Sequence, residues 1–173
     1  EDFAKFLENY KPNNITITKD KYSVEKDYVD VEISIADYHL AKKTVDGDND
    51  PSTRARRYIT MAQSLIEKVK ANYNINNVVL PISNDFFHTD NYQHQTTNGT
   101  PQDTIMDYSE EYELGFAVLV DTINMVRQLA NKVTVVLVQG NHDRTKSFYL
   151  AHALDVFFRD ELDVEFIREH SVI

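Results

Sequence analysis

The chain of 173 residues contains no cysteine. Disulfides and thiolate metal sites are therefore excluded, and any metal must be held by His, Asp, Glu or Asn side chains. Long apolar runs are also missing: no stretch approaches the ~18 residues that a membrane span requires, and the acidic start lacks the basic-then-apolar pattern of a secretion signal. We therefore expect a soluble, cytoplasmic protein with no membrane partner.

Basic residues are few relative to acidic ones, with 18 Lys and Arg against 28 Asp and Glu, which gives a formal charge of −10. This balance argues against a protein that coats nucleic acid through a basic face. It does not exclude an enzyme that acts on phosphates, because bound cations can neutralise ligand carboxylates. The length and the 42% apolar content suit a single domain, residues 1–173, with a substantial core.

Hydrophobic periodicity predicts strands and helices in alternation after a polar lead-in, residues 1–27, that has helical spacing over 3–10 and a short strand at 15–17. The predicted strands are 28–35, 78–82, 133–138 and 162–166. The predicted helices begin at Pro51 behind the cap Asp50, at about 105 and at 148, and end near 72, 132 and 158. This order predicts an α/β fold with a largely parallel sheet and right-handed crossovers.

Polar clusters follow the first three predicted strands. Their members are Asp37 and His39, then Asp85 and His88, then Asn141, His142 and Asp143. Each cluster alone is typical of a solvated loop, a cap or a polar turn. The carboxyl ends of parallel strands share one edge of a sheet, so all three clusters can converge there. Their amides, imidazoles and carboxylates together predict a metal site.

The three clusters resemble the calcineurin-like metallophosphoesterase superfamily, whose motifs are D-x-H, G-D-x-x-(D/H) and G-N-H-(D/E) at successive strand ends. Asp37-Tyr38-His39 and Gly140-Asn141-His142-Asp143 have the form of the first and third motifs. Asn84-Asp85-Phe86-Phe87-His88 approximates the second, and its F-F-H element is similar to one in DNA repair exonucleases and phage phosphoesterases. The resemblance covers about residues 29–158 and implies a layered αββα sandwich around a largely parallel sheet.

The resemblance implies a metal-dependent phosphoesterase, with a phosphodiesterase or nuclease as the first expectation and DNA as one candidate substrate. It implies two divalent ions, Mn²⁺ first, with Fe, Zn or Mg as the other candidates. Asp37 and His39 would bind one ion, Asp85 would bridge both, and Asn141 would bind the second. Such a pair of ions activates a water molecule for attack on the phosphate.

The same resemblance implies catalytic roles for three further residues. His142 would contact the phosphate, Asp143 would orient its imidazole, and His88 would lie near the scissile phosphate. Arg54 and Arg57, at the start of the first long helix, are candidate phosphate contacts, although a solvated helix face is the simpler interpretation.

Two departures from the family pattern leave alternatives open. Asn84 stands where the family has Gly, and no His after Asp143 is followed by the family's G-H-x-H motif. We therefore expect either the N-terminal part of a longer enzyme, truncated at its C-terminus, or a relative that binds metal poorly. A non-catalytic binding or scaffold module and a phosphomonoesterase are the alternative functions. The sequence gives no indication of the oligomeric state.

Overall fold

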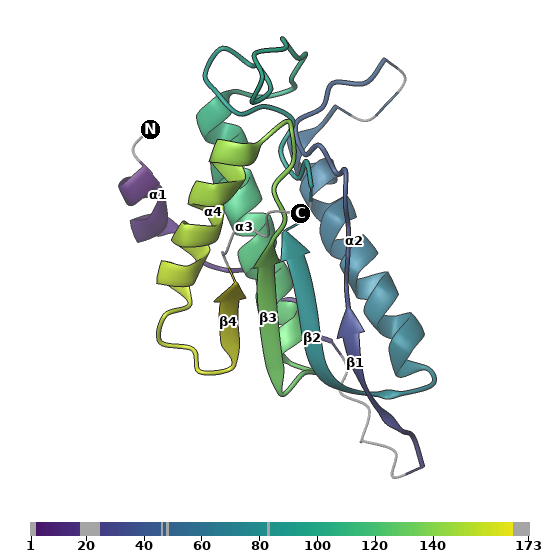
Figure 1. Ribbon diagram of the computed structural model, residues 1–173. Helices are drawn as coiled ribbons and strands as arrows, with labels where there is room; N and C mark the ends of the chain where they lie inside the picture. Colours follow the sequence, from purple (N-terminus) through teal and green to yellow (C-terminus); the bar gives the residue numbers. More distant parts are fainter. Residues whose placement is uncertain (1–2, 18–24, 46, 48, 83, 168–173) are drawn as a thin grey trace.

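The central element of the fold is a parallel sheet of four strands in the order β1-β2-β3-β4 (Figure 1). The computed structural model describes residues 3–17, 25–45, 47, 49–82 and 84–167. The strands are β1 (Tyr28–Glu32), β2 (Asn74–Ile82), β3 (Lys132–Leu137) and β4 (Val164–Ile167). The predicted α/β class with a parallel sheet is confirmed.

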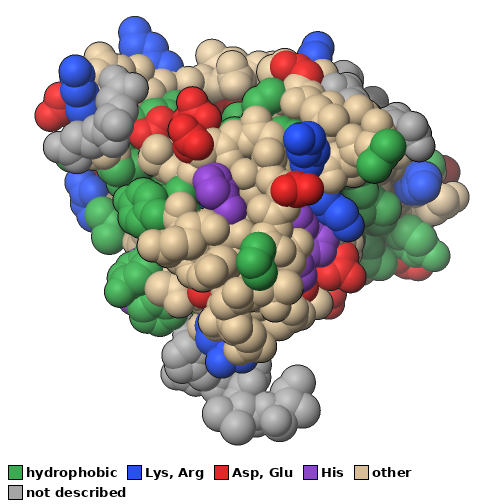
Figure 2. All heavy atoms as spheres, turned by 90° about the horizontal axis from the view of Figure 1, so that it is seen from above, with side chains coloured by type: hydrophobic (Ala, Val, Ile, Leu, Met, Phe, Trp, Pro, Cys, Tyr) green, Lys and Arg blue, Asp and Glu red, His purple; other side chains and the backbone are tan. Residues whose placement is uncertain are grey.

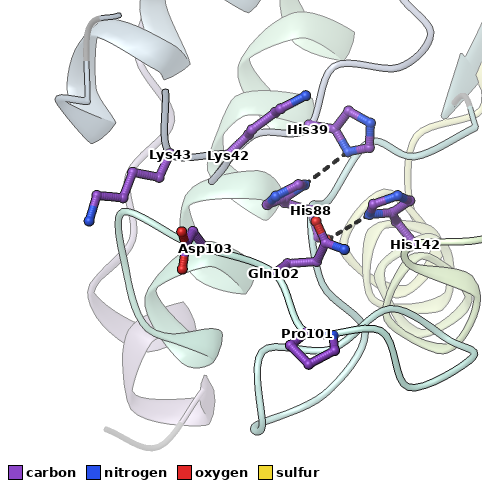
Figure 3. Close-up of a pocket in the computed structure, with 8 residues that line it drawn as sticks. All are labelled: His39, Lys42, Lys43, His88, Pro101, Gln102, Asp103 and His142. Atoms are coloured by element: carbon purple, nitrogen blue, oxygen red, sulfur yellow. Dashed lines mark hydrogen bonds between the residues drawn. The ribbon is translucent and has the colours of Figure 1, made fainter. Parts of the chain in front are cut away.

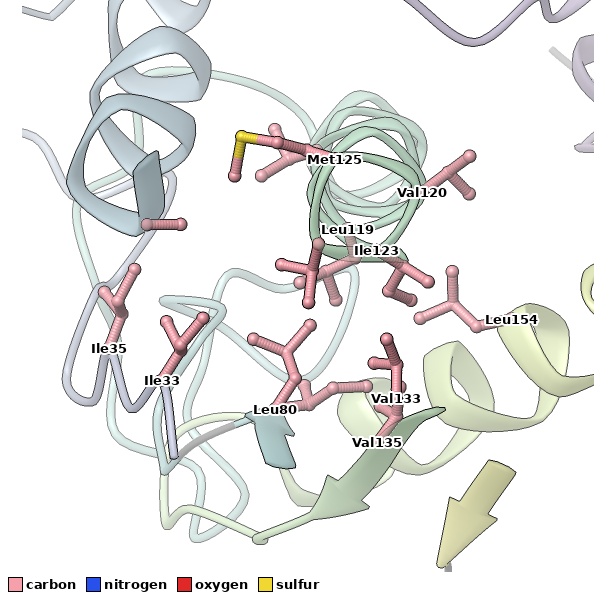
Figure 4. Packing of buried hydrophobic residues seen from close by; sticks show 14 of the residues in the cluster. Ile33, Ile35, Leu80, Leu119, Val120, Ile123, Met125, Val133, Val135 and Leu154 are labelled. Carbon is pink, nitrogen blue, oxygen red and sulfur yellow. The ribbon is translucent and has the colours of Figure 1, made fainter. Parts of the chain in front are cut away.

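Three helices connect successive strands, namely α2 (Pro51–Lys70), α3 (Tyr108–Arg127) and α4 (Arg144–Phe157). Each strand is added on the same side of the previous one, so right-handed crossovers place all three helices on one face of the sheet. Figure 4 shows Leu80, Val133 and Val135 pointing from this face toward Leu119 and Ile123 of α3. These five side chains are buried and form the centre of the core.

The first turn of α2 is formed as the sequence predicts. The Asp50 side chain accepts a hydrogen bond from the Thr53 backbone N–H at 2.8 Å, and Pro51 occupies the first helical position. Tyr58, Ala62 and Ile66 form the buried face of the helix. Within the described residues, no helix has both the length and the apolar character needed to cross a membrane.

The N-terminal segment covers the side of α3 that faces away from the sheet. Helix α1 (Phe3–Asn9) packs through Phe3 against Phe116, with ring centroids 5.5 Å apart, so the predicted helix in this region is confirmed. The predicted strand at residues 15–17 is wrong. The Gln128 side chain of α3 instead donates to the Ile15 carbonyl at 2.6 Å, so a polar side chain replaces a neighbouring strand as hydrogen-bond partner.

Strand β1 ends at Glu32, three residues before the predicted end at Ile35. Ile33 N still donates to the Val79 carbonyl at 2.9 Å, and Ile33 and Ile35 are buried. The alternating apolar pattern therefore continues beyond the regular strand pairing. The chain then turns away from the sheet edge at Asp37, where the candidate site begins.

Candidate metal centre

The first two polar clusters are joined by main-chain hydrogen bonds just beyond the ends of β1 and β2. Asp37 N donates to the Asn84 carbonyl at 2.9 Å, and His39 N donates to the Asp85 carbonyl at 3.0 Å. The third cluster is joined to the second because His142 N donates to Asp85 Oδ1 at 2.7 Å. Asp85 is 4% exposed and joins the three segments, because it accepts hydrogen bonds from both His39 N and His142 N.

Two groups of candidate ligands result, and they share His39. The first contains Asp37, His39 and Asp85, and the second contains His39, His88 and His142; within each group one ligand atom per residue lies within 4.8 Å of the others. Carboxylate oxygens with an imidazole nitrogen are donors that suit Mn²⁺, Fe²⁺ or Zn²⁺. The residues present therefore fit the divalent ions that the sequence resemblance implies.

The three imidazole rings lie close together at the edge of the sheet (Figure 3). His39 Nδ1 is 3.2 Å from His88 Nδ1, and His142 Nδ1 is 3.0 Å from the His88 carbonyl oxygen. On the other side of its ring, His39 Nε2 lies 4.0 Å from Asp37 Oδ1. The two nitrogens of His39 thus face the two different groups.

Gly140 explains why the third cluster begins with glycine. A Cβ atom at this position would lie 2.0 Å from Asp85 Oδ1 and 2.3 Å from Asp85 N, which is far inside van der Waals contact. Only a residue without a side chain lets the loop after β3 approach Asp85 closely enough for the His142 N–H to reach its carboxylate. The glycine therefore sets the position of Asp85.

Three residues of the site have left-handed backbone conformations, with φ values of 53° at Asp37, 49° at His39 and 57° at Asp85. Non-glycine residues adopt this region infrequently because the Cβ atom crowds the backbone. Such conformations persist where surrounding hydrogen bonds determine them, and they cluster at functional sites. The main-chain bonds between residues 37–39 and 84–85 supply that constraint here.

Burial favours the neutral form of two of the imidazoles, those of His88 and His39. It lowers the pKa of His88 to about 3, with further lowering by the neighbouring His39 and His142. The pKa of His39 is also lowered, first by burial and then by His142. A neutral imidazole has a lone pair available for a metal ion, so lowering the pKa of His39 and His88 favours the protonation state of a metal ligand.

Asp143 is buried, and the hydrogen-bond partner of His142 Nδ1 is a different group. Asp143 Oδ2 accepts a hydrogen bond from Phe87 N at 2.8 Å, and its Oδ1 is buried without a hydrogen-bond partner. Burial raises the pKa of this carboxyl group to about 7. The group that orients the His142 ring is instead the His88 carbonyl, and the sequence contains no signal for such a contact.

An open pocket of about 490 Å³ lies in front of the imidazoles. It is lined by His39, Lys42, Lys43, His88, Pro101, Gln102, Asp103 and His142. Figure 2, which looks down on this edge of the sheet, shows histidine side chains at the surface with acidic and basic side chains around them. The long loop 89–104 forms one wall and is held by β-bridges between Gln95 and Pro101 and between Lys42 and Thr104.

The two arginines proposed from the sequence do not line this pocket. Arg54 is buried, and its guanidinium donates to the Lys42 carbonyl at 2.9 Å, while Arg57 is exposed on α2. Lys42 and Lys43 supply the cationic lining instead. Their position three and four residues after His39 was the available signal, and sequence reasoning missed it.

Asn141 is brought to the same edge but is exposed. Its carbonyl accepts a hydrogen bond from Thr97 N at 3.2 Å, so the loop 89–104 also contacts this segment. No family model, no curated protein and no solved structure matches the chain. The functional assignment therefore rests on the geometry of the site.

Proposed function

We propose that this protein is a metal-dependent phosphoesterase, with phosphodiester bonds, including those of DNA, as its first expected substrates. The observation that carries the proposal is the convergence of Asp37, His39 and Asp85 from separate segments beside a pocket with two lysines. Carboxylates and an imidazole supply metal ligands, and lysines supply charge complementary to a phosphate.

Asp37, His39, Asp85 and Asn141 would hold divalent ions, Mn²⁺ first because the donors mix oxygen and nitrogen, with Fe²⁺, Zn²⁺ or Mg²⁺ as the other candidates. When bound, such ions polarise a phosphoryl oxygen and lower the pKa of a coordinated water molecule. Asp85 is suited to the central ligand position because its Oδ1 is already fixed by the His142 N–H at 2.7 Å.

The protein's own groups then bind the phosphate and move a proton. His142 lines the pocket, and donation of its Nδ1 proton to the His88 carbonyl leaves Nε2 as the nitrogen that exchanges a proton. Lys42 and Gln102 line the same pocket and can donate hydrogen bonds to phosphate oxygens. His88 lies against His39 and lines the same pocket.

We also propose that the domain is a layered αββα sandwich. The face of the sheet opposite the helices is mixed: Thr134 and Glu165 lie on it beside Val79, and the next row of side chains is Pro81, Val136 and Ile167, of which Ile167 is 43% exposed. A second covering layer would bury this apolar row. A second sheet packed on this face would supply it.

The function is tested with Asp85→Asn, assayed with Mn²⁺ on bis-p-nitrophenyl phosphate, p-nitrophenyl phosphate and single-stranded DNA. Asn retains an acceptor for the His142 N–H and tolerates positive φ, so we expect an unchanged melting temperature. It loses the carboxylate charge, and we expect hydrolysis of the diester to fall by more than about 100-fold. Asp160→Asn, whose side chain is 85% exposed, is the matched control and should retain full activity.

Hydrolysis by Asp85→Asn at the unsubstituted rate would contradict the assignment of Asp85 as a ligand. Failure of the unsubstituted protein to hydrolyse any of the three substrates with Mn²⁺, Fe²⁺, Zn²⁺ or Mg²⁺ would contradict the proposed enzymatic activity. It would favour a non-catalytic binding module. A preference for p-nitrophenyl phosphate would indicate that the protein is a phosphomonoesterase and not a phosphodiesterase.

A further inference from the structure

We propose that His39, His88 and His142 together bind a single Zn²⁺ ion or a similar borderline ion, forming a three-histidine site that shares only His39 with the carboxylate group. When this site is filled, His142 Nε2 is a metal ligand and does not exchange the proton assigned to it in the proposed phosphoesterase. In this site His88 is a metal ligand, whereas the sequence resemblance places it near the scissile phosphate. The three side chains come from three segments of the chain and lie close together at the pocket (Figure 3).

The spacing of the ring nitrogens supports a shared ion. Two imidazole nitrogens bound to one tetrahedral Zn²⁺ at about 2.0–2.1 Å lie about 3.3 Å from each other. His39 Nδ1 and His88 Nδ1 are 3.2 Å apart, which is this distance. His142 completes the group, since its ligand atom lies within 4.8 Å of the other two.

The His142 ring already has the outer partner that a metal-bound histidine needs. A histidine ligand almost always gives its second ring N–H to a carbonyl or a carboxylate, which fixes the ring orientation. His142 Nδ1 lies 3.0 Å from the His88 carbonyl, leaving Nε2 for the ion. His39 Nε2 lies 4.0 Å from Asp37 Oδ1, which is beyond hydrogen-bond distance, while its Nδ1 is the nitrogen beside His88.

The backbone of each histidine is held by its own hydrogen bond. His39 N donates to the Asp85 carbonyl at 3.0 Å and His142 N to Asp85 Oδ1 at 2.7 Å. His88 N donates to the buried Glu111 Oε1 at 2.8 Å. Because the three positions are fixed before an ion arrives, little ordering cost remains to be met on binding.

Three nitrogen donors without a carboxylate select a borderline ion over Mg²⁺ or Ca²⁺, which prefer oxygen ligands. Three protein ligands also leave a fourth tetrahedral position free, as in catalytic zinc sites. All three imidazoles line the pocket with Lys42 and Gln102, so this position opens toward a space that can admit water or an anion.

The proposal does not rest on the proposed phosphoesterase activity. The test is titration of chelator-treated protein with Co²⁺, which reports tetrahedral nitrogen coordination by its visible absorption, followed by displacement with Zn²⁺. We expect one equivalent of tetrahedral Co²⁺, displaced by Zn²⁺ and not by excess Mg²⁺. His88→Ala should weaken Co²⁺ binding by at least about 100-fold. His152→Ala, a histidine of α4 outside the group, should leave it unchanged.

His88 is 4% exposed, so its substitution can disturb the fold. His142→Ala is therefore the second variant, because this side chain is only half-buried, and it should cause the same loss with an unchanged circular dichroism spectrum. Absence of tetrahedral Co²⁺ in the unsubstituted protein, or unchanged Co²⁺ binding in both variants, would overturn the proposal.

Asp85→Asn separates this proposal from the proposed function. It should keep the Co²⁺ spectrum, since Asn still accepts the His142 N–H, while it loses diester hydrolysis. If the protein binds tetrahedral Co²⁺ but hydrolyses no phosphoester, the three-histidine site is supported and only the proposed phosphoesterase activity is overturned. Loss of the spectrum in Asp85→Asn with retention in His88→Ala would assign the ion to the carboxylate group and overturn the three-histidine site.

Discussion

The hydrogen atom that serves as the side chain of Gly140 leaves just enough room for Asp85. Substituting Gly140→Ala would place a methyl group 2.0 Å from Asp85 Oδ1, and the backbone on both sides must move to admit it. We expect a loss of about 1–3 kcal/mol in the free energy of unfolding, the usual cost of overpacking. Metal binding should weaken as well, because the displaced loop carries His142. Urea denaturation and the Co²⁺ titration measure the two effects.

Gly99→Ala is the control for this glycine. Gly99 has φ +85° but no atom within 4 Å of a built Cβ, so its substitution carries backbone strain without a collision. We expect a stability loss of about 1–2 kcal/mol and unchanged metal affinity. Equal metal affinities of the Gly140→Ala and unsubstituted proteins would show that the close approach to Asp85 does not position the site.

The sequence identifies some residues of the site and cannot identify others. Asp37, His39 and Asp85 could be predicted because each follows an apolar run, and the carboxyl ends of parallel strands meet at one edge. The contact of His142 with the His88 carbonyl could not be predicted, because it depends on how two loops pack. Lys42 lines the pocket for a similar reason, since a β-bridge to Thr104 sets its position.

At the scale of elements, α3 and α4 are joined beneath the site by a buried ion pair. Lys146 Nζ lies 2.6 Å from Glu111 Oε2, and the two side chains are 0% and 1% exposed. Glu111 also accepts hydrogen bonds from His88 N at 2.8 Å and Thr89 Oγ1 at 3.1 Å. The pair therefore connects two helices to the segment that carries His88.

Lys146→Met removes the cation and leaves the Glu111 carboxylate buried without its charged partner. We expect a loss of about 3–5 kcal/mol in the free energy of unfolding, measured by chemical denaturation. Glu111→Gln in the same chain should recover part of this loss, because the amide still accepts from His88 N and carries no charge. A double variant less stable than Lys146→Met alone would contradict the attribution to an unpaired buried charge.

The element boundaries show where periodicity is informative. The helix at Pro51 was predicted correctly at its start because Asp50 and Pro51 are local signals that act within one turn. Helix α4 begins at Arg144, four residues before the predicted start, because tertiary contacts bury Lys146 and Ser147 in its first turn. Because these buried side chains are polar, the first turn of the helix lacks the apolar spacing on which the prediction depended.

Across the whole molecule, the N-terminal segment holds α3 against the sheet from the outside. Asp121 of α3 is 2% exposed and accepts hydrogen bonds from Asn13 N at 2.8 Å, Asn13 Nδ2 at 2.7 Å and Tyr10 OH at 3.3 Å. One carboxylate thus joins parts of the chain separated by 108 residues. Sequence patterns do not reveal such long-range contacts, which explains why this segment was predicted only as a lead-in.

Asp121→Ala removes the acceptor for all three of these donors. We expect a stability loss of about 1.5–3 kcal/mol, the usual value for hydrogen bonds to a charged group. Amide hydrogen exchange should accelerate over residues 3–17 and stay slow in β2 and β3, because the sheet core keeps its own contacts. Asp121→Asn retains one acceptor oxygen, so its stability and its exchange rates should lie between those of Asp121→Ala and those of the unsubstituted protein.

The candidate metal centre should not respond to this change. Asp121 lies ten residues beyond Glu111 on α3, or about 15 Å along the helix, and substitutions at such distances act independently. We therefore expect the Co²⁺ affinity of Asp121→Ala to equal that of the unsubstituted protein. Slow exchange maintained over residues 3–17 would show that Asp121 does not hold the N-terminal segment. A weakened Co²⁺ affinity would mean that the segment supports the site through α3, because Glu111 on that helix holds the backbone of His88.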